Sequence, residues 1–145
     1  DMLTDAGIII EDPGFLRTWS GYHNLEFLYT LRNKKNKDYL CSVLRKVGLD
    51  PALKRPVGKY SLGMRQRLAL AQAIMEDPGI LIVDEPMNGL DKNGVREIRE
   101  LLLKMKEENK MIILASHNRE DIEVLCDEVY EMEGGVISKV KDETN

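Results

Sequence analysis

Three apolar runs of the sequence end in polar side chains that could do chemistry. These side chains are Glu11, Asp84 with Glu85, and Ser116 with His117. A carboxylate that ends an apolar strand is costly unless it holds a cation or accepts a hydrogen bond, and two adjacent carboxylates can divide metal coordination from activation of a water molecule. The alternative for Asp84 and Glu85 is a helix-capping aspartate beside a solvated glutamate. Ligands of open α/β sheets bind beyond the carboxyl ends of the strands, so we expect these side chains to share one site.

A phosphate-binding turn is the second candidate site, at residues 60–64, which read Tyr-Ser-Leu-Gly-Met. Ser61 presents a hydroxyl group, and Gly63 lets the backbone approach a ligand closely. The helix expected to follow offers unpaired N–H groups and the positive end of its dipole. This combination of groups favours binding of a phosphate.

The hydrophobic pattern predicts the elements that must position these residues. Continuous apolar runs predict strands at 6–10, 80–83 and 111–115, and the run at 80–83 is typical of a parallel strand covered on both faces. Periodicity and capping residues predict helices after Ser20, around 40–47, after Ser61, over 95–105 and after Asn118, then a hairpin of 129–132 with 136–140. The order predicts an α/β fold with a mostly parallel sheet, interrupted by a helical insert.

Composition and charge exclude several classes of protein. The chain has 145 residues, is 43% hydrophobic and carries a net charge of −4, so we expect a globular domain that does not bind nucleic acid through a basic surface. Its longest apolar run, at 111–115, is far shorter than the roughly 20 residues that span a bilayer. We therefore expect no membrane span and no secretion signal. Cys41 and Cys126 lack metal-ligand spacing, and an apolar helix-like context predicts a buried thiol at Cys126.

Two segments resemble one family of ATPases. Residues 80–85 are similar to the Walker B strand of P-loop ATPases, and residues 60–68 are similar to the signature sequence of the ABC ATPase family, usually written Leu-Ser-Gly-Gly-Gln. Leu62 and Met64 stand where the family usually has Gly and Gln, whereas Ser61 and Gly63 are retained. The resemblance implies a partial P-loop NTPase (ABC ATPase) fold, with ATP and Mg²⁺ as cofactors and two subunits that sandwich two nucleotides head to tail.

The same resemblance implies a role for each candidate residue. Asp84 would order Mg²⁺ through water, Glu85 would be the general base, and His117 would link the terminal phosphate with Glu85. Ser61 and Gly63 would contact the terminal phosphate of the ATP bound to the opposite subunit. Asp91, at the end of Asn88-Gly89-Leu90-Asp91, resembles the D-loop aspartate that contacts the partner subunit. The alternatives are an ordinary helix cap for Asp91 and a packed or surface histidine for His117.

Glu11 and an absent loop mark departures from the family pattern. Glu11 stands where the family usually has the Q-loop glutamine, so it is a candidate for contact with the nucleotide and its metal, and Glu11-Asp12-Pro13 is reminiscent of the branch that exports peptide antibiotics and bacteriocins. A surface acid is the alternative. The chain has no Gly-x-x-x-x-Gly-Lys-Ser/Thr phosphate-binding loop. Because the family places that loop upstream of the segment matching residues 6–11, we expect it before residue 1 and expect the chain to be a fragment.

These observations predict part of an ABC nucleotide-binding domain, with its catalytic core at 1–11 and 68–145 and a helical subdomain at 12–67. The aromatic side chains of that subdomain predict either a cleft for a transmembrane permease or simple internal packing; they are Phe15, Trp19, Tyr22, Phe27 and Tyr29. The expected function is ATP hydrolysis by a subunit that lies on the inner face of the cell membrane, pairs with an identical or different second ATPase subunit, and powers export. The alternatives are a non-transport ABC ATPase and a nucleotide-independent module that pairs with a complete subunit.

Overall fold

Three parallel strands form the sheet that places the candidate residues. The computed structural model describes residues 5–9 and 14–140. Its main sheet has the order β1 (Ala6–Ile9), β2 (Ile80–Asp84) and β3 (Met111–Ala115), and every pair is parallel. The three predicted strands are therefore confirmed, although Ile10, predicted as the last residue of the first strand, lies outside the described residues.

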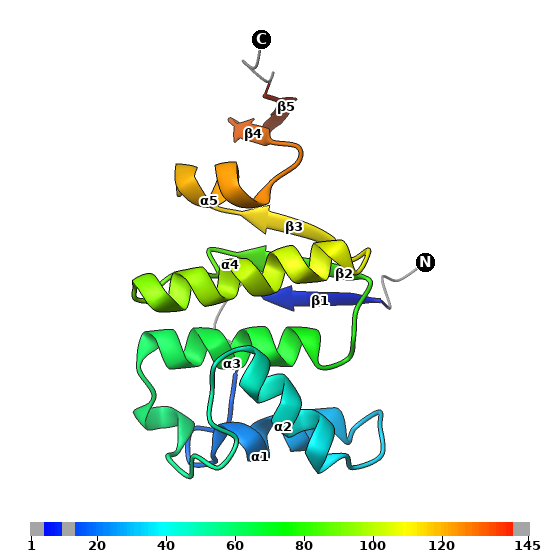
Figure 1. The fold of residues 1–145 in the computed structure, drawn as a ribbon, viewed down its shortest axis with the longest axis vertical. Coiled ribbons are helices and arrows are strands. Elements are labelled where there is room, and N and C mark those ends of the chain that lie inside the picture. The colour runs from blue at the N-terminus through cyan, green and yellow to red at the C-terminus, as the bar shows by residue number, and fades with distance from the viewer. Residues whose placement is uncertain (1–4, 10–13, 141–145) are drawn as a thin grey trace.

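One face of this sheet is covered and the other is largely open in the described chain. Right-handed crossovers between sequential parallel strands place their helices on the same face, and here α3 (Leu62–Ile74) packs on β1 while α4 (Lys92–Glu107) packs on β3 (Figure 1). Leu81 and Val83 are buried beneath them. On the opposite face, Ile8 and Ile113 are 53% and 49% exposed. The prediction that residues 80–83 are covered on both faces therefore holds only on the helix-bearing side, because the described residues place no helix against the other.

The helical insert forms a second packing unit around α3. Helix α1 (Gly21–Tyr29) and helix α2 (Lys37–Lys46) pack against each other and against α3, and the short 3-10 helix Val57–Lys59 precedes Ser61. The insert therefore shares its core with the helix that also covers β1. Figure 1 shows α1 and α2 at the end of the molecule opposite the C-terminal hairpin. The predicted boundary between residues 67 and 68 falls inside α3, and the division into two domains remains a prediction.

Local capping chemistry sets where the helices begin. The side-chain oxygen at each cap accepts a hydrogen bond from the main-chain N–H three residues later, which satisfies one of the unpaired donors of the first turn. The capping residues are Ser20 for α1, Asn36 for α2, Ser61 for α3, Asp91 for α4 and Asn118 for α5 (Arg119–Leu125). The caps predicted at Ser20, Ser61 and Asn118 are therefore confirmed.

The predicted β-hairpin is the last element of the described residues. Strands β4 (Tyr130–Glu133) and β5 (Val136–Lys139) pair antiparallel, and Gly134 and Gly135 both have positive φ, 57° and 81°, as a two-residue hairpin turn of the mirror-image type requires. Both strands are exposed along their length, including the apolar side chains of Met132 and Ile137. Among the helices described, none is both long and apolar enough to cross a membrane.

The two cysteines are half-buried and unpaired in the described structure. Cys126 follows α5, and burial raises the pKa of its thiol above the ordinary value, with Asp127 adding to that effect. The predicted buried thiol at Cys126 is thus only partly buried. Within the described residues, the two cysteines are free and neither belongs to a group of metal-binding side chains, and their reduced state remains a prediction.

Candidate functional site

The carboxyl ends of β2 and β3 bring Glu85 and His117 together, as predicted. Asp84 is the last residue of β2 and is in register with Ala115 at the end of β3. The main-chain N–H of Glu85 donates a hydrogen bond of 2.8 Å to the carbonyl oxygen of Ala115. The N–H of His117 then donates a bond of 2.7 Å to Oε1 of Glu85. Two residues far apart in the chain therefore form one polar site.

Glu85 adopts a backbone conformation that non-glycine residues rarely take. Its φ is 46°, in the left-handed region, which costs an L-residue about 1–3 kcal/mol and persists only where the surroundings hold it. The carbonyl oxygen of Glu85 accepts bonds from the N–H of Asn88, at 3.1 Å, and from Nε2 of Gln66, at 2.8 Å. Strained backbone conformations of this kind cluster at active sites. The hydrogen bonds to its main chain hold Glu85, which is half-buried, in this conformation.

His117 contacts Glu85 through its main chain and not through its imidazole. The side chain of His117 is exposed, and Oγ of the preceding Ser116 accepts the N–H of Asn118 at 3.0 Å. Asn118 in turn caps α5 through a bond of 3.0 Å from the N–H of Asp121. The loop after β3 is thus held by local caps, and the side chain of His117 lies at the surface.

Asp84 is exposed at the end of β2, next to Glu85. Across residues 5–9 and 14–140, no group of three or more His, Cys, Asp or Glu side chains is arranged to enclose a metal ion. Mg²⁺ does not need such a cage, because it keeps several waters and takes one or two carboxylates together with substrate phosphates. Asp84 with Glu85 fits that mode of binding. Glu11, predicted to contact the metal and the nucleotide, lies outside the described residues.

Ser61 sits at the N-terminus of α3 with its hydroxyl near the first turn. Its Oγ accepts the N–H of Met64 at 3.1 Å, and its carbonyl accepts the N–H of Arg65 at 3.0 Å. A serine hydroxyl has one proton to donate besides the lone pairs used in capping, so a capping Ser61 can still donate to an anion. Ser61 is exposed, so its hydroxyl group is accessible to a ligand. Gly63, predicted to act with it, is buried.

The turn at Ser61 packs on the segment 88–91 of the same chain, a contact that sequence reasoning missed. A Cβ at Gly63 would lie 2.8 Å from the carbonyl oxygen of Gly89, and a Cβ at Gly89 would lie 2.7 Å from Cγ of Leu62. Gly89 also has φ of 78°. Both positions therefore exclude larger residues, and Leu62, which stands where the family usually has glycine, lies close to Gly89.

Asp91 caps α4, as the simpler of its two interpretations requires. Its Oδ1 accepts the N–H of Gly94 at 2.7 Å. Gly94 is itself buried, and a Cβ there would lie 2.7 Å from Nη2 of Arg67. The cap fixes Asp91 at the exposed end of the loop. Contact of Asp91 with a partner subunit remains a prediction.

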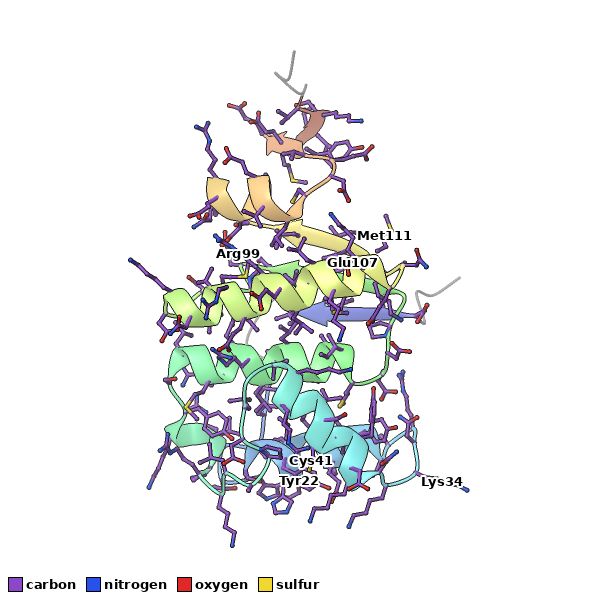
Figure 2. The ribbon with its side chains drawn as sticks, viewed as in Figure 1. Tyr22, Lys34, Cys41, Arg99, Glu107 and Met111 are labelled. Atoms are coloured by element: carbon purple, nitrogen blue, oxygen red, sulfur yellow. The ribbon has the colours of Figure 1, made fainter. Side chains whose placement is uncertain are left out.

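The aromatic residues of the insert divide between packing and exposure. Phe15, Tyr22 and Tyr29 pack against the core, and Figure 2 shows Tyr22 on the helical insert near α2. Trp19 and Phe27 instead are 41% and 48% exposed, with their rings edge to face and the centroids 5.7 Å apart. They line an open hollow of about 530 Å³ together with His23, Glu26, Thr30 and Lys35. Internal packing is therefore observed for Phe15, Tyr22 and Tyr29, whereas a permease cleft at Trp19 and Phe27 remains a prediction.

Curated relatives of the chain are ATP-binding proteins of transporters. The chain is 42% identical to the uncharacterized ABC transporter ATP-binding protein YhcH of Bacillus subtilis, covering 94% of this chain and 46% of that protein. It is 42% identical to the bacitracin transport ATP-binding protein BcrA of Enterococcus faecalis, covering 96% of this chain and 46% of that protein. It is 39% identical to the lantibiotic transport ATP-binding protein SrtF of Streptococcus pyogenes, covering 93% of this chain and 59% of that protein. The chain thus spans about half the length of the curated relatives it matches.

Solved structures share the fold. The dimeric structure of MJ0796, a bacterial ABC transporter cassette, matches with a TM-score of 0.82 at 18% identity, over 95% of this chain and 64% of that one. A post-hydrolysis state of the same cassette bound to ADP and Pi matches with a TM-score of 0.80 at 19% identity, over 94% and 63%. The predicted α/β fold of the ABC ATPase type is confirmed.

A family model described as ABC transporter matches residues 4–88, which is more than half of the chain. The match extends from before β1 through the turn at Ser61 to the site at Asp84 and Glu85. The resemblance drawn from residues 60–68 and 80–85 is therefore confirmed, and this chain belongs to the ABC transporter family.

Proposed function

We propose that this chain is part of the ATP-hydrolysing subunit of an ABC transporter that exports its cargo through a membrane permease. The observation that carries the proposal is the placement of Glu85, in a left-handed conformation at the end of β2 with Oε1 bonded to the N–H of His117. A carboxylate held in one orientation at a strand end is suited to accept a proton from a water molecule.

In this proposal the two carboxylates have different tasks. Asp84, the more exposed of the two, would hold Mg²⁺, and the ion would neutralise charge on the transferring phosphoryl group. Glu85 accepts the proton of the attacking water at Oε2, because Oε1 is already bonded to the N–H of His117. The exposed imidazole of His117 contacts the terminal phosphate. The negative charge on the transferring phosphoryl group is therefore stabilised by groups that are in position before the reaction.

The second half of the proposed site is contributed by another subunit, either identical or related. The hydroxyl proton of Ser61 and the N–H groups at the start of α3 lie at an exposed helix end, where they can donate to a phosphate bound by the partner. Gly63 keeps the backbone close to the ligand, and Asp91 contacts the partner from the adjoining loop. Support comes from the dimeric form of the related cassette MJ0796.

Binding of the nucleotide phosphates in the same subunit needs a loop that residues 1–145 do not contain. We infer that this loop belongs to a part of the protein beyond these residues, in keeping with curated relatives about twice as long. Glu11 would contact the nucleotide-bound metal where the family usually has glutamine. Below, "complete subunit" means residues 1–145 joined to that phosphate-binding part.

The hollow on the helical insert and the names of two relatives support a permease contact and a class of cargo. The hollow lined by Trp19 and Phe27 is open and aromatic, which suits the reception of a short permease helix at the inner face of the membrane. Relatives named for bacitracin and lantibiotic transport support a peptide antibiotic as the cargo. Such a subunit lies at the membrane surface through its permease and needs no span of its own.

Substitution Glu85→Gln in the complete subunit tests the proposed function. Glutamine keeps the size of the side chain and can still accept the N–H of His117, but it cannot act as a base. We expect ATP hydrolysis to collapse while ATP-driven dimerisation persists. Unchanged turnover would remove Glu85 from the mechanism. Calorimetric titration of residues 1–145 with ATP and Mg²⁺ completes the test: we expect no tight binding, and tight binding would require a phosphate site elsewhere in these residues.

A further inference from the structure

We propose that Gln66 is a positioning residue for Glu85, which it ties to the helix that begins at Ser61. The Nε2 of Gln66 donates a hydrogen bond of 2.8 Å to the carbonyl oxygen of Glu85, a residue 19 positions away in the chain. The proposal rests on the proposed role of Glu85 as the base. Gln66 lies within the signature-like segment 60–68, but the sequence patterns assign it no role of its own.

Glu85 is held in its left-handed conformation from several directions. Its N–H bonds the carbonyl of Ala115 at 2.8 Å, its carbonyl accepts the N–H of Asn88 at 3.1 Å, and its Oε1 accepts the N–H of His117 at 2.7 Å. All three of these partners are main-chain groups. Among the described residues, Gln66 is the one side chain that hydrogen-bonds Glu85. A substitution at position 66 therefore removes one of the hydrogen bonds that hold Glu85 and leaves the strands unaltered.

The position of Gln66 on α3 gives this bond a mechanical role. Gln66 lies five residues after Ser61, about 7.5 Å along the helix axis at 1.5 Å per residue. The same helix packs against β1 and against α1 and α2 of the insert. The bond from Gln66 therefore fixes the position of Glu85, the proposed general base, relative to α3. The N-terminus of the same helix is the part proposed to bind the phosphate held by the partner subunit. A shift of α3 relative to the sheet would lengthen the bond and displace the carboxylate.

Two substitutions at this position separate the hydrogen bond from the volume of the side chain. Gln66→Ala removes the donor and the volume. Gln66→Glu keeps the volume, removes the donor and sets a carboxylate against the carbonyl oxygen of Glu85. The matched control is Tyr39→Phe, which removes the hydrogen bond from the Tyr39 hydroxyl to the carbonyl of Met75. That bond also joins α3 to another element, but at the opposite end of the helix from Glu85.

Steady-state hydrolysis by the complete subunit is the first measurement. We expect both Gln66 variants to lower kcat roughly tenfold to a hundredfold with KM for ATP unchanged, because a displaced base affects the chemical step and not nucleotide binding. ATP-driven dimerisation should persist in both variants. Tyr39→Phe should retain the kcat of the wild type.

Amide hydrogen exchange in residues 1–145 is the second measurement and does not depend on activity. We expect the N–H groups of Glu85 and His117 to exchange faster in both Gln66 variants and at the wild-type rate in Tyr39→Phe. Wild-type kcat in the Gln66 variants, in a subunit that Glu85→Gln inactivates, would overturn the proposal. An equal loss of kcat in Tyr39→Phe would do the same. If Glu85→Gln leaves hydrolysis unchanged, the proposed function fails, and exchange at these two amides alone decides whether Gln66 holds Glu85.

Discussion

The main-chain N–H of His117 donates a hydrogen bond of 2.7 Å to Oε1 of Glu85, so the loop after β3 orients the carboxylate that follows β2. The donor belongs to the backbone, and any residue except proline at position 117 can supply it. The imidazole of His117 is exposed and is not part of this contact. Orientation of Glu85 and any action of the imidazole are therefore two separable contributions.

Substitution His117→Ala separates them. We expect exchange at the main-chain N–H of residue 117 to be unchanged, because the bond to Oε1 of Glu85 remains. Hydrolysis by the complete subunit should fall by roughly two to four orders of magnitude, the usual effect of losing a side chain that acts on the reacting groups. Hydrolysis at the wild-type rate would mean that position 117 contributes only its backbone.

Substitution Gly89→Ala should force apart the turn at Ser61 and the segment 88–91. The new Cβ would lie 2.7 Å from Cγ of Leu62 and would occupy a residue with φ of 78°. We expect the free energy of unfolding to fall by about 2–5 kcal/mol, the sum of left-handed strain and overpacking. Chemical denaturation measures the change.

Gly134→Ala is the control for strain alone, because Gly134 also has positive φ, 57°, but a Cβ added there would meet no atom within 4 Å. It should cost only about 1–2 kcal/mol. Adding Leu62→Ala to Gly89→Ala removes the two closest atoms and should restore part of the lost stability. Equal costs for Gly89→Ala and Gly134→Ala would show that the contact with Leu62 contributes nothing.

Substitution Arg99→Ala should detach α5 from α4. Asp121 is only 3% exposed, and Nε of Arg99, on α4 (Figure 2), donates to its Oδ1 at 2.8 Å. That hydrogen bond raises the pKa of Arg99, so the guanidinium stays charged. Loss of Arg99 leaves a buried carboxylate unpaired, at a cost of about 3 kcal/mol in the free energy of unfolding.

The matched control for Arg99 is Lys106→Ala. Lys106 joins α4 to Asp127 through an exposed ion pair of 3.0 Å, so its loss should cost less than about 1 kcal/mol. A double-mutant cycle of Arg99 with Asp121 should give a coupling well above that of Lys106 with Asp127. Similar couplings for the two pairs would mean that burial of Asp121 adds nothing to its interaction with Arg99.

Residues 1–145 should self-associate through the open face of the sheet. Ile8 and Ile113 are exposed on that face, and Met111, which begins β3 (Figure 2), is 60% exposed. Contiguous apolar surface of this kind is rarely left open in monomeric proteins. We expect Ile113→Lys to shift the population toward monomer in light scattering, whereas Leu31→Lys, on the helical insert, should not. A dilute, stable wild-type monomer would contradict this prediction.

Alkylation of Cys126 should be slow at pH 8. Burial raises the pKa of its thiol above the ordinary value, so less of the reactive thiolate is present at that pH than in the unfolded chain. The rate of reaction with iodoacetamide in a Cys41→Ser variant should rise with pH along a curve displaced to higher pH than that of the same variant in denaturant. Coincident curves would show that the fold does not protect this thiol.

Much of the local structure could be predicted from the sequence, because strands and helix starts depend on neighbouring residues. The apolar run 80–83 predicts β2 and the place of Asp84 and Glu85 at its end. Ser61 predicts the start of α3, since a serine hydroxyl satisfies an N–H of the first turn wherever that helix lies. The parallel sheet then follows from the order of the elements, and with it the meeting of Glu85 and His117.

Other features of the site depend on how elements pack, which periodicity does not encode. The left-handed φ of Glu85 is not visible in a sequence, since glutamate has no preference for it. The contact of Leu62 with Gly89 and the bond from Gln66 to Glu85 join segments that only the docking of α3 brings together.

The sequence by itself thus determined the kinds of side chain available and the strand and helix ends that carry them, because capping and hydrophobic patterning act over a few residues. Only the tertiary structure decided which backbone groups hold Glu85, which face of the sheet stays open, and that Trp19 and Phe27 are exposed while Tyr22 is packed. These outcomes are set by the distances and orientations between elements far apart in the chain, and hydrogen bonds and close packing respond to those distances within a few tenths of an ångström.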